Sequence, residues 1–83
     1  MGARILAQFA TEARAVADRY ALAHIATDYN PRRTEGPYVC LYRWPFEEEY
    51  STAFPAYTPE DAVANLEEAL WQAYHSNQVI SRH

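Results

Sequence analysis

The chain has 83 residues, of which 49% are hydrophobic and 14% aromatic, and its formal net charge is −4. This length predicts a single domain over residues 1–83, and a domain this small buries only about 60 to 65% of its unfolded surface, so a homodimer or another obligate partner stays open. The composition is too apolar for a disordered acidic tail, and no apolar run reaches the ~18 residues that span a bilayer. We therefore expect a soluble globular domain without a membrane segment.

Residues 3 to about 20 show the pattern of an amphipathic helix. Their apolar side chains recur at spacings of three and four and form one stripe: Ile5, Phe9, Ala13, Val16 and Tyr20. The period weakens after Tyr20, because the next stripe positions hold Ala23, His24 and Thr27. Two continuations are open. The favoured one extends the helix to about Asp28 because alanine tolerates it, and the other makes residues 23–29 a short strand.

A loop follows, opened by Asn30-Pro31 and closed by Gly36-Pro37. Tyr38 to Trp44 then reads as a strand rich in aromatic and β-branched residues. Its even-numbered positions, Tyr38 to Trp44, share one apolar face, and Val39 and Leu41 make the opposite face apolar as well. Such a strand must be covered twice, so we expect helices on one face and a partner chain or a ligand on the other.

The next segment is predicted to pair with that strand. Pro45-Phe46 turns the chain, and Glu47 to Phe54 alternates in the manner of a returning antiparallel strand. Its first half contains Glu47, Glu48 and Glu49, and such a charged segment suits the edge of a sheet.

Thr58 to Tyr74 is the clearest helix in the chain. Thr58 can cap it, Pro59 suits the first helical position, and Glu60 and Asp61 place negative charge at the positive end of the helix dipole. An apolar stripe runs along it: Ala62, Val63, Leu66, Ala69, Leu70, Ala73 and Tyr74. After Tyr74 the periodicity is lost, and a short strand at Val79-Ile80 is one interpretation.

These elements predict an α+β fold, a small antiparallel sheet of two or three strands covered on one face by two helices. The order is α-β-β-α, or α-β-β-β-α if residues 23–29 form a strand. A sheet of two strands is marginal by itself, which favours the third strand or pairing between chains.

No constellation for catalysis or metal binding emerges from the spacing. Cys40 could pair with His24 or His75 as nucleophile and base, yet it lies in mid-strand without a setting that lowers its pKa. The chain lacks His-x-x-x-His and Cys-x-x-Cys spacings, and its two glycines make no phosphate-binding loop. We expect neither an enzyme nor a cofactor. The single cysteine and the absence of a signal-peptide pattern suggest a cytoplasmic protein.

Nucleic acid is the alternative partner. Arg32, Arg33 and Arg43, with tyrosines nearby, could hold phosphates and stack a base. The order α-β-β-β-α resembles the double-stranded RNA-binding domain in outline, but that domain presents basic residues where this chain has Glu60 and Asp61. These carboxylates would repel phosphates and argue against the alternative.

The charge distribution favours a protein partner with a basic surface. Residues 1–44 carry six arginines against four carboxylates, a balance of +2, whereas residues 45–83 carry one arginine against seven carboxylates, a balance of −6. Trp71 lies off the apolar stripe and is flanked by acidic residues, as an interface anchor would be, although cover by Val79 and Ile80 is equally open. The candidate binding residues are Trp71, Glu67, Glu68, Glu60, Asp61, Glu47, Glu48 and Glu49.

Residues 58–70 resemble one known family. Thr58-Pro59-Glu60-Asp61-Ala62, Asn65 and Glu68-Ala69-Leu70 are similar to the helix start of HicB-type antitoxins, which implies an inhibitor that binds a toxin. Small acidic inhibitors carried by phages, including anti-CRISPR proteins, resemble this chain in size, charge and lack of catalytic motifs. The resulting hypothesis is a non-enzymatic inhibitor or regulator that occupies a basic functional surface, with a structural subunit of a larger assembly as a further alternative.

Overall fold

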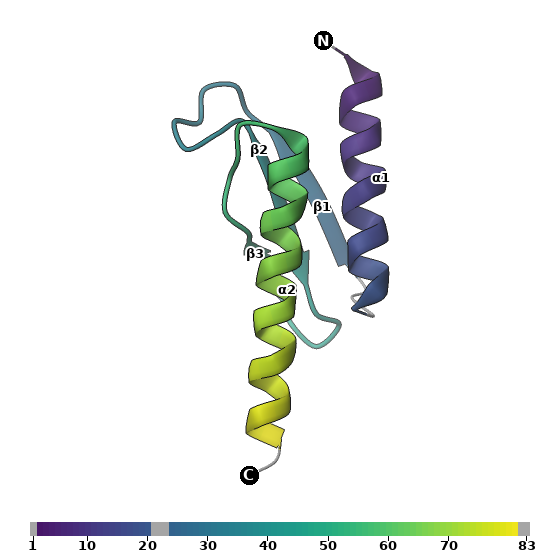
Figure 1. The fold of residues 1–83 in the computed structure, drawn as a ribbon, viewed down its shortest axis with the longest axis vertical. Coiled ribbons are helices and arrows are strands. Elements are labelled where there is room, and N and C mark those ends of the chain that lie inside the picture. The colour runs from purple at the N-terminus through teal and green to yellow at the C-terminus, as the bar shows by residue number, and fades with distance from the viewer. Residues whose placement is uncertain (1, 21–23, 82–83) are drawn as a thin grey trace.

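The computed structural model describes residues 2–20 and 24–81, and the side chains up to His75. Its elements are α1 (Ala3–Arg19), β1 (His24–Tyr29), β2 (Tyr38–Arg43), β3 (Ser51–Thr52) and α2 (Pro59–Ser81), as Figure 1 shows. The strands form one antiparallel sheet in the order β1-β2-β3. The predicted α+β fold is confirmed, with the longer order α-β-β-β-α.

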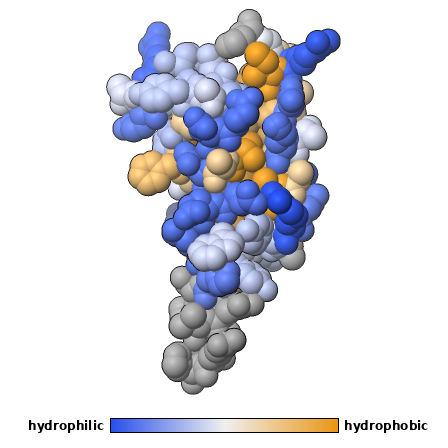
Figure 2. All heavy atoms as spheres, in the orientation of Figure 1, coloured by the Kyte–Doolittle hydropathy of each residue, from blue (hydrophilic) through white to orange (hydrophobic). Residues whose placement is uncertain are grey.

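Both helices contribute to one core against the same face of the sheet. Phe9 and Val16 of α1 and Leu66 and Leu70 of α2 are buried against Cys40 and its neighbours on β2. The Phe9 ring meets the Tyr38 ring edge-on, with 5.5 Å between their centroids. Figure 2 shows the helical face of the molecule, where hydrophobic side chains gather in the seam between the two helices.

The segment after α1 is a strand, so the favoured prediction of a helix to Asp28 is wrong and the alternative is right. α1 ends at Arg19, and β1 pairs along all six of its residues with β2, from His24 opposite Arg43 to Tyr29 opposite Tyr38. β1 contains Ile25, Thr27 and Tyr29, which favour strands, and its pairing with β2 outweighs the helix preference of the neighbouring alanines. Ala23, which both interpretations included, lies outside the described residues.

The central strand β2 ends at Arg43, one residue earlier than predicted, and Trp44 still packs against the core. Tyr38 and Cys40 point toward the helices, so Val39 between them points to the opposite face of the sheet and lies outside the core cluster. Val39 is nevertheless buried. The cover that the sequence predicted for this second face, a partner chain or a ligand, stays a prediction.

The returning strand is much shorter than the predicted Glu47–Phe54. Only Ser51–Thr52 is regular, because Glu47 belongs to a turn in which its N–H donates to the Trp44 carbonyl over 3.0 Å. The chain pairs again where Ala56 faces Tyr38, so two residues of β2 oppose three residues of the third strand. This bulge at Phe54-Pro55 reverses the alternation of faces, and Ala53 and Ala56 are therefore both buried.

Helix α2 begins as predicted and ends later. The Asp61 N–H donates to Thr58 Oγ1 over 3.1 Å, which is the predicted N-cap, and Ala62, Leu66 and Leu70 are fully buried. The helix continues to Ser81, so the predicted end near Tyr74 and the strand at Val79-Ile80 are wrong. Its 23 residues make it ~34 Å long, and in Figure 1 its second half extends past the sheet. No helix within the described residues is both long enough and apolar enough to cross a bilayer.

Candidate functional site

Trp71 lies on the side of α2 that faces away from the buried stripe. Its side chain is 51% exposed, and its ring lies against the His75 ring one helical turn further on, with 4.1 Å between centroids. Trp71 is therefore half-exposed to solvent, and the His75 ring packs beside it. The alternative of cover by Val79 and Ile80 concerns side chains that lie outside the described ones.

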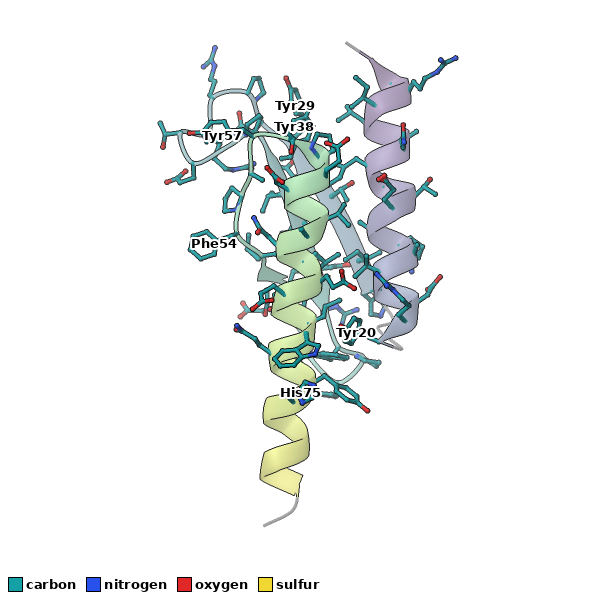
Figure 3. The ribbon with its side chains drawn as sticks, in the orientation of Figure 1. Tyr20, Tyr29, Tyr38, Phe54, Tyr57 and His75 are labelled. Atoms are coloured by element: carbon teal, nitrogen blue, oxygen red, sulfur yellow. The ribbon has the colours of Figure 1, made fainter. Side chains whose placement is uncertain are left out.

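A solvent-open hollow of about 510 Å³ adjoins Trp71, where the end of α1 approaches the middle of α2. It is lined by Tyr20 from the C-terminal end of α1 and by Ala64, Glu67, Glu68 and Trp71 from α2. Ala64 leaves the space open because its side chain is a single methyl group. Figure 3 shows Tyr20 at the end of α1 and His75 further along α2. We call these five lining residues the Trp71 surface.

Both carboxylates of the Trp71 surface have a partner within the chain. Arg19 Nη2 lies 2.9 Å from Glu67 Oε2, and the two side chains are 60% and 44% exposed. Gln72 Nε2 donates to Glu68 Oε1 over 2.9 Å, one turn along the helix. Each bond uses one oxygen, and the described contacts show no hydrogen bond to Glu67 Oε1 or Glu68 Oε2.

The other acidic residues predicted for the site lie elsewhere. Glu60 and Asp61 are in the first turn of α2, and Glu60 lies 11 positions before Trp71, which is ~16 Å along the helix. Glu47, Glu48 and Glu49 line a separate hollow together with Tyr50 and Ser51. Glu47 is also held in place, because its carboxylate accepts a hydrogen bond from the Trp44 N–H over 3.1 Å. The structure thus divides the predicted acidic site into three groups.

The three arginines of the alternative nucleic-acid site do not form one patch. The Arg33 guanidinium is already bonded to nearby residues, since its Nη2 lies 2.6 Å from Asp28 Oδ2 of β1 and its Nη1 donates to the Pro37 carbonyl over 3.0 Å. Arg43 lies at the opposite end of β2, where it donates to the Glu47 carbonyl and stands 5.6 Å from the Tyr50 ring centroid. Arg32 alone of the three is exposed without a side-chain bond among the described residues.

Cys40 and His24, one of the two cysteine–histidine pairs considered from the sequence, lie on opposite faces of the sheet. Cys40 is fully buried, and burial raises its pKa to about 12, so the thiol stays protonated at neutral pH. Cys40 faces Thr27 on the inner face of the sheet, whereas His24 pairs with Arg43 and therefore points to the outer face. No group of three or more histidines, cysteines or carboxylates within the described part of the chain could hold a metal ion.

Two residues at the candidate site were not identified from the sequence: Tyr20, which lines the hollow, and Arg19, which pairs with Glu67 beside it. Both come from the end of α1, and only the packing of the two helices brings them to α2. Spacings of three or four residues predict ion pairs within one helix, but no spacing in the sequence predicts an ion pair between two helices. The flanking positions on α2 itself, Ala64, Glu67, Glu68 and His75, follow from the helical period.

Comparison of the chain with protein-family models, with curated proteins and with solved structures finds no match in any of the three. The similarity of residues 58–70 to HicB-type antitoxins therefore carries no family assignment, and much of it is accounted for by the N-cap at Thr58 and the acidic first turn.

Proposed function

We propose that this chain is a non-enzymatic protein-binding domain, an inhibitor or regulator that uses the Trp71 surface to occupy a basic functional surface of another protein. The observation that carries the proposal is the half-exposed Trp71 beside an open hollow with two carboxylates. Tryptophan is among the residues that most often dominate the binding energy of protein interfaces, especially where a pocket adjoins it.

The position of Trp71 supports a role in binding because folding does not require it there. The buried stripe of α2 is complete with Ala62, Leu66 and Leu70, and Trp71 adds nothing to that core. The chain nevertheless presents its large apolar ring to solvent, on a helix that extends past the sheet (Figure 1). An exposed large apolar side chain beside a hollow is a feature of binding sites.

The charge of this part of the chain supports a basic partner. Seven carboxylates lie within residues 45–83 against one arginine, and Glu67 and Glu68 line the hollow itself. Complementary charge raises the rate of association and selects against acidic surfaces and phosphate backbones. A toxin and a nucleic-acid-binding enzyme are the candidate partners that the resemblance to HicB-type antitoxins and to phage inhibitors implies.

The test compares the binding of matched variants. The purified chain retains proteins from an extract of the native host, and each retained protein is identified by mass spectrometry, purified and titrated by calorimetry. We expect Trp71→Ala to weaken the binding of the true partner at least ~10-fold, in the range of an interface hot spot. Raised salt is expected to weaken it further.

Phe54→Ala is the control, because it removes another exposed aromatic side chain. Phe54 is 80% exposed and lies on the far edge of the domain from Tyr20 in Figure 3. Equal loss of binding in Phe54→Ala and Trp71→Ala, or full binding in both, would show that the Trp71 surface is not the interface.

A further inference from the structure

We infer that the hollow of the Trp71 surface is a binding site for an arginine side chain of the partner, and that Arg19 of this chain competes for the same carboxylates. The inference rests on the proposed function and adds to it the chemical group that is recognised. It is carried by the juxtaposition of a half-exposed indole, two neighbouring carboxylates and an open space beside Ala64.

The carboxylates leave room for a second cation. Arg19 occupies Glu67 Oε2 and Gln72 occupies Glu68 Oε1, so the described contacts use only one oxygen of each residue. A guanidinium carries five N–H donors in a flat fork that matches carboxylate oxygens. A partner guanidinium can therefore bind the remaining oxygen of Glu67 or of Glu68, and at Glu67 it competes with Arg19.

The lining of the hollow favours arginine over lysine. Trp71 and Tyr20 are the aromatic lining residues, and a guanidinium stacks on aromatic rings, whereas the compact and strongly hydrated ammonium of lysine does not. The Ala64 methyl group leaves the depth that a long side chain needs. A site built from charge alone would treat arginine and lysine alike.

Arg19 shows that Glu67 accepts a guanidinium and also limits the affinity for another. Its Nη2 lies 2.9 Å from Glu67 Oε2, yet its side chain is 60% exposed, so the pair is solvated and weak. Its positive charge beside the hollow repels a second cation. Removal of Arg19 is therefore expected to tighten the binding of arginine.

The probes are three five-residue peptides, acetylated and amidated, with arginine, lysine or citrulline between alanines. Citrulline keeps the flat shape of arginine without its charge. Two-dimensional NMR follows the Trp71 indole N–H and the backbone amides of Glu67 and Glu68 during titration. We expect the arginine peptide to shift these signals and to bind about 3-fold more tightly than the lysine peptide, the range of a solvent-exposed cation–π contact. The citrulline peptide should leave the signals in place.

Two pairs of variants test the geometry. Ala64→Leu places three further carbon atoms between Trp71 and the two carboxylates, and it is expected to weaken the binding of the arginine peptide at least ~5-fold, the equivalent of about 1 kcal/mol. Ala15→Leu, at an exposed position of α1, adds the same volume elsewhere and should not change the affinity for the arginine peptide.

Arg19→Gln is expected to tighten binding of the arginine peptide ~2- to 5-fold, whereas Arg14→Gln removes the same charge from the same helix and should have a much smaller effect. Circular dichroism confirms that each variant is folded.

Equal affinity for the arginine and lysine peptides would overturn the inference, as would unchanged binding in Ala64→Leu or equal effects of Arg19→Gln and Arg14→Gln. These failures are distinct from failure of the proposed function. A partner whose capture requires Trp71 would keep the proposed function even if the peptides showed no preference for arginine.

Discussion

The first turn and the middle of α2 contain the same kinds of acidic residue in different surroundings. In the first turn, Glu60 and Asp61 follow the Thr58 cap, and the Asp61 N–H is bonded to the Thr58 hydroxyl. In the middle of the helix, Glu67 and Glu68 lie beside Trp71, at an open hollow. The first pair lies where the helix dipole favours negative charge, and the second pair lies beyond the reach of that effect.

This difference shows which acidic residues require a functional explanation. Carboxylates in the first turn stabilise the helix, so their presence is accounted for without any partner. Glu67 and Glu68 lie outside the first turn and make only exposed bonds, to Arg19 and Gln72, which stabilise the fold little. They also neighbour an aromatic side chain that the core does not use. The comparison therefore narrows the predicted interface from both acidic pairs of the helix to one.

The largest expected effect separates the buried side of α2 from its exposed side. Leu66 is fully buried, so Leu66→Ala should lower the free energy of unfolding by about 2 to 5 kcal/mol, enough to unfold a domain of this size in part. Trp71→Ala should change it by no more than about 0.5 kcal/mol, because Trp71 lies outside the core. Urea unfolding followed by circular dichroism measures both. A loss above 2 kcal/mol for Trp71→Ala would mean that Trp71 is structural, and the comparison would fail.

A smaller effect is expected at the cap. Thr58→Ala removes the oxygen that accepts the Asp61 N–H, so we expect a loss of about 1 kcal/mol in the free energy of unfolding. Binding at the Trp71 surface should be unchanged, since Thr58 lies 13 positions before Trp71, ~20 Å along the helix. Thr11→Ala is the control, because Thr11 lies within α1 and bonds only to the preceding turn through Ala7. Equal losses at Thr58 and Thr11 would show that the cap contributes nothing specific.

The sequence predicted the elements whose signals are local. The start of α2 follows from Thr58 and its acidic first turn, and the buried sides of both helices follow from their apolar periods. The structure of residues 24–29 depends instead on pairing with β2, whose facing positions are up to 19 residues away in the sequence, from His24 to Arg43. Local propensity therefore favoured the wrong state. The bulge at Phe54-Pro55 was not predicted for a similar reason, since it reflects the fit of the chain against β2.

The candidate site was predicted in part. The helical period placed Trp71 with Ala64, Glu67 and Glu68 on one side of the helix, and the structure brings these residues together around the hollow. The predicted interface also contained Glu60, Asp61 and the loop glutamates, because the charge of a segment does not show how far its residues lie from Trp71 in the fold. Arg19 and Tyr20 join the site only through the packing of α1 on α2, which the sequence of either helix does not encode by itself.

The smallest expected effect concerns the ion pair that joins the two helices at the Trp71 surface. Because the Arg19 and Glu67 side chains are 60% and 44% exposed, a double-mutant cycle with Arg19→Gln and Glu67→Gln should give a coupling energy of only about 0.5 kcal/mol, decreasing as salt is raised. The same cycle with Arg19→Gln and Glu60→Gln should give none, since Glu60 lies in the first turn of α2. Chemical denaturation of the four proteins in each cycle measures both values. A coupling above 2 kcal/mol would make Glu67 a structural residue like those of the first turn. A weak coupling leaves Glu67 able to exchange its internal arginine for an external one at little cost to the fold.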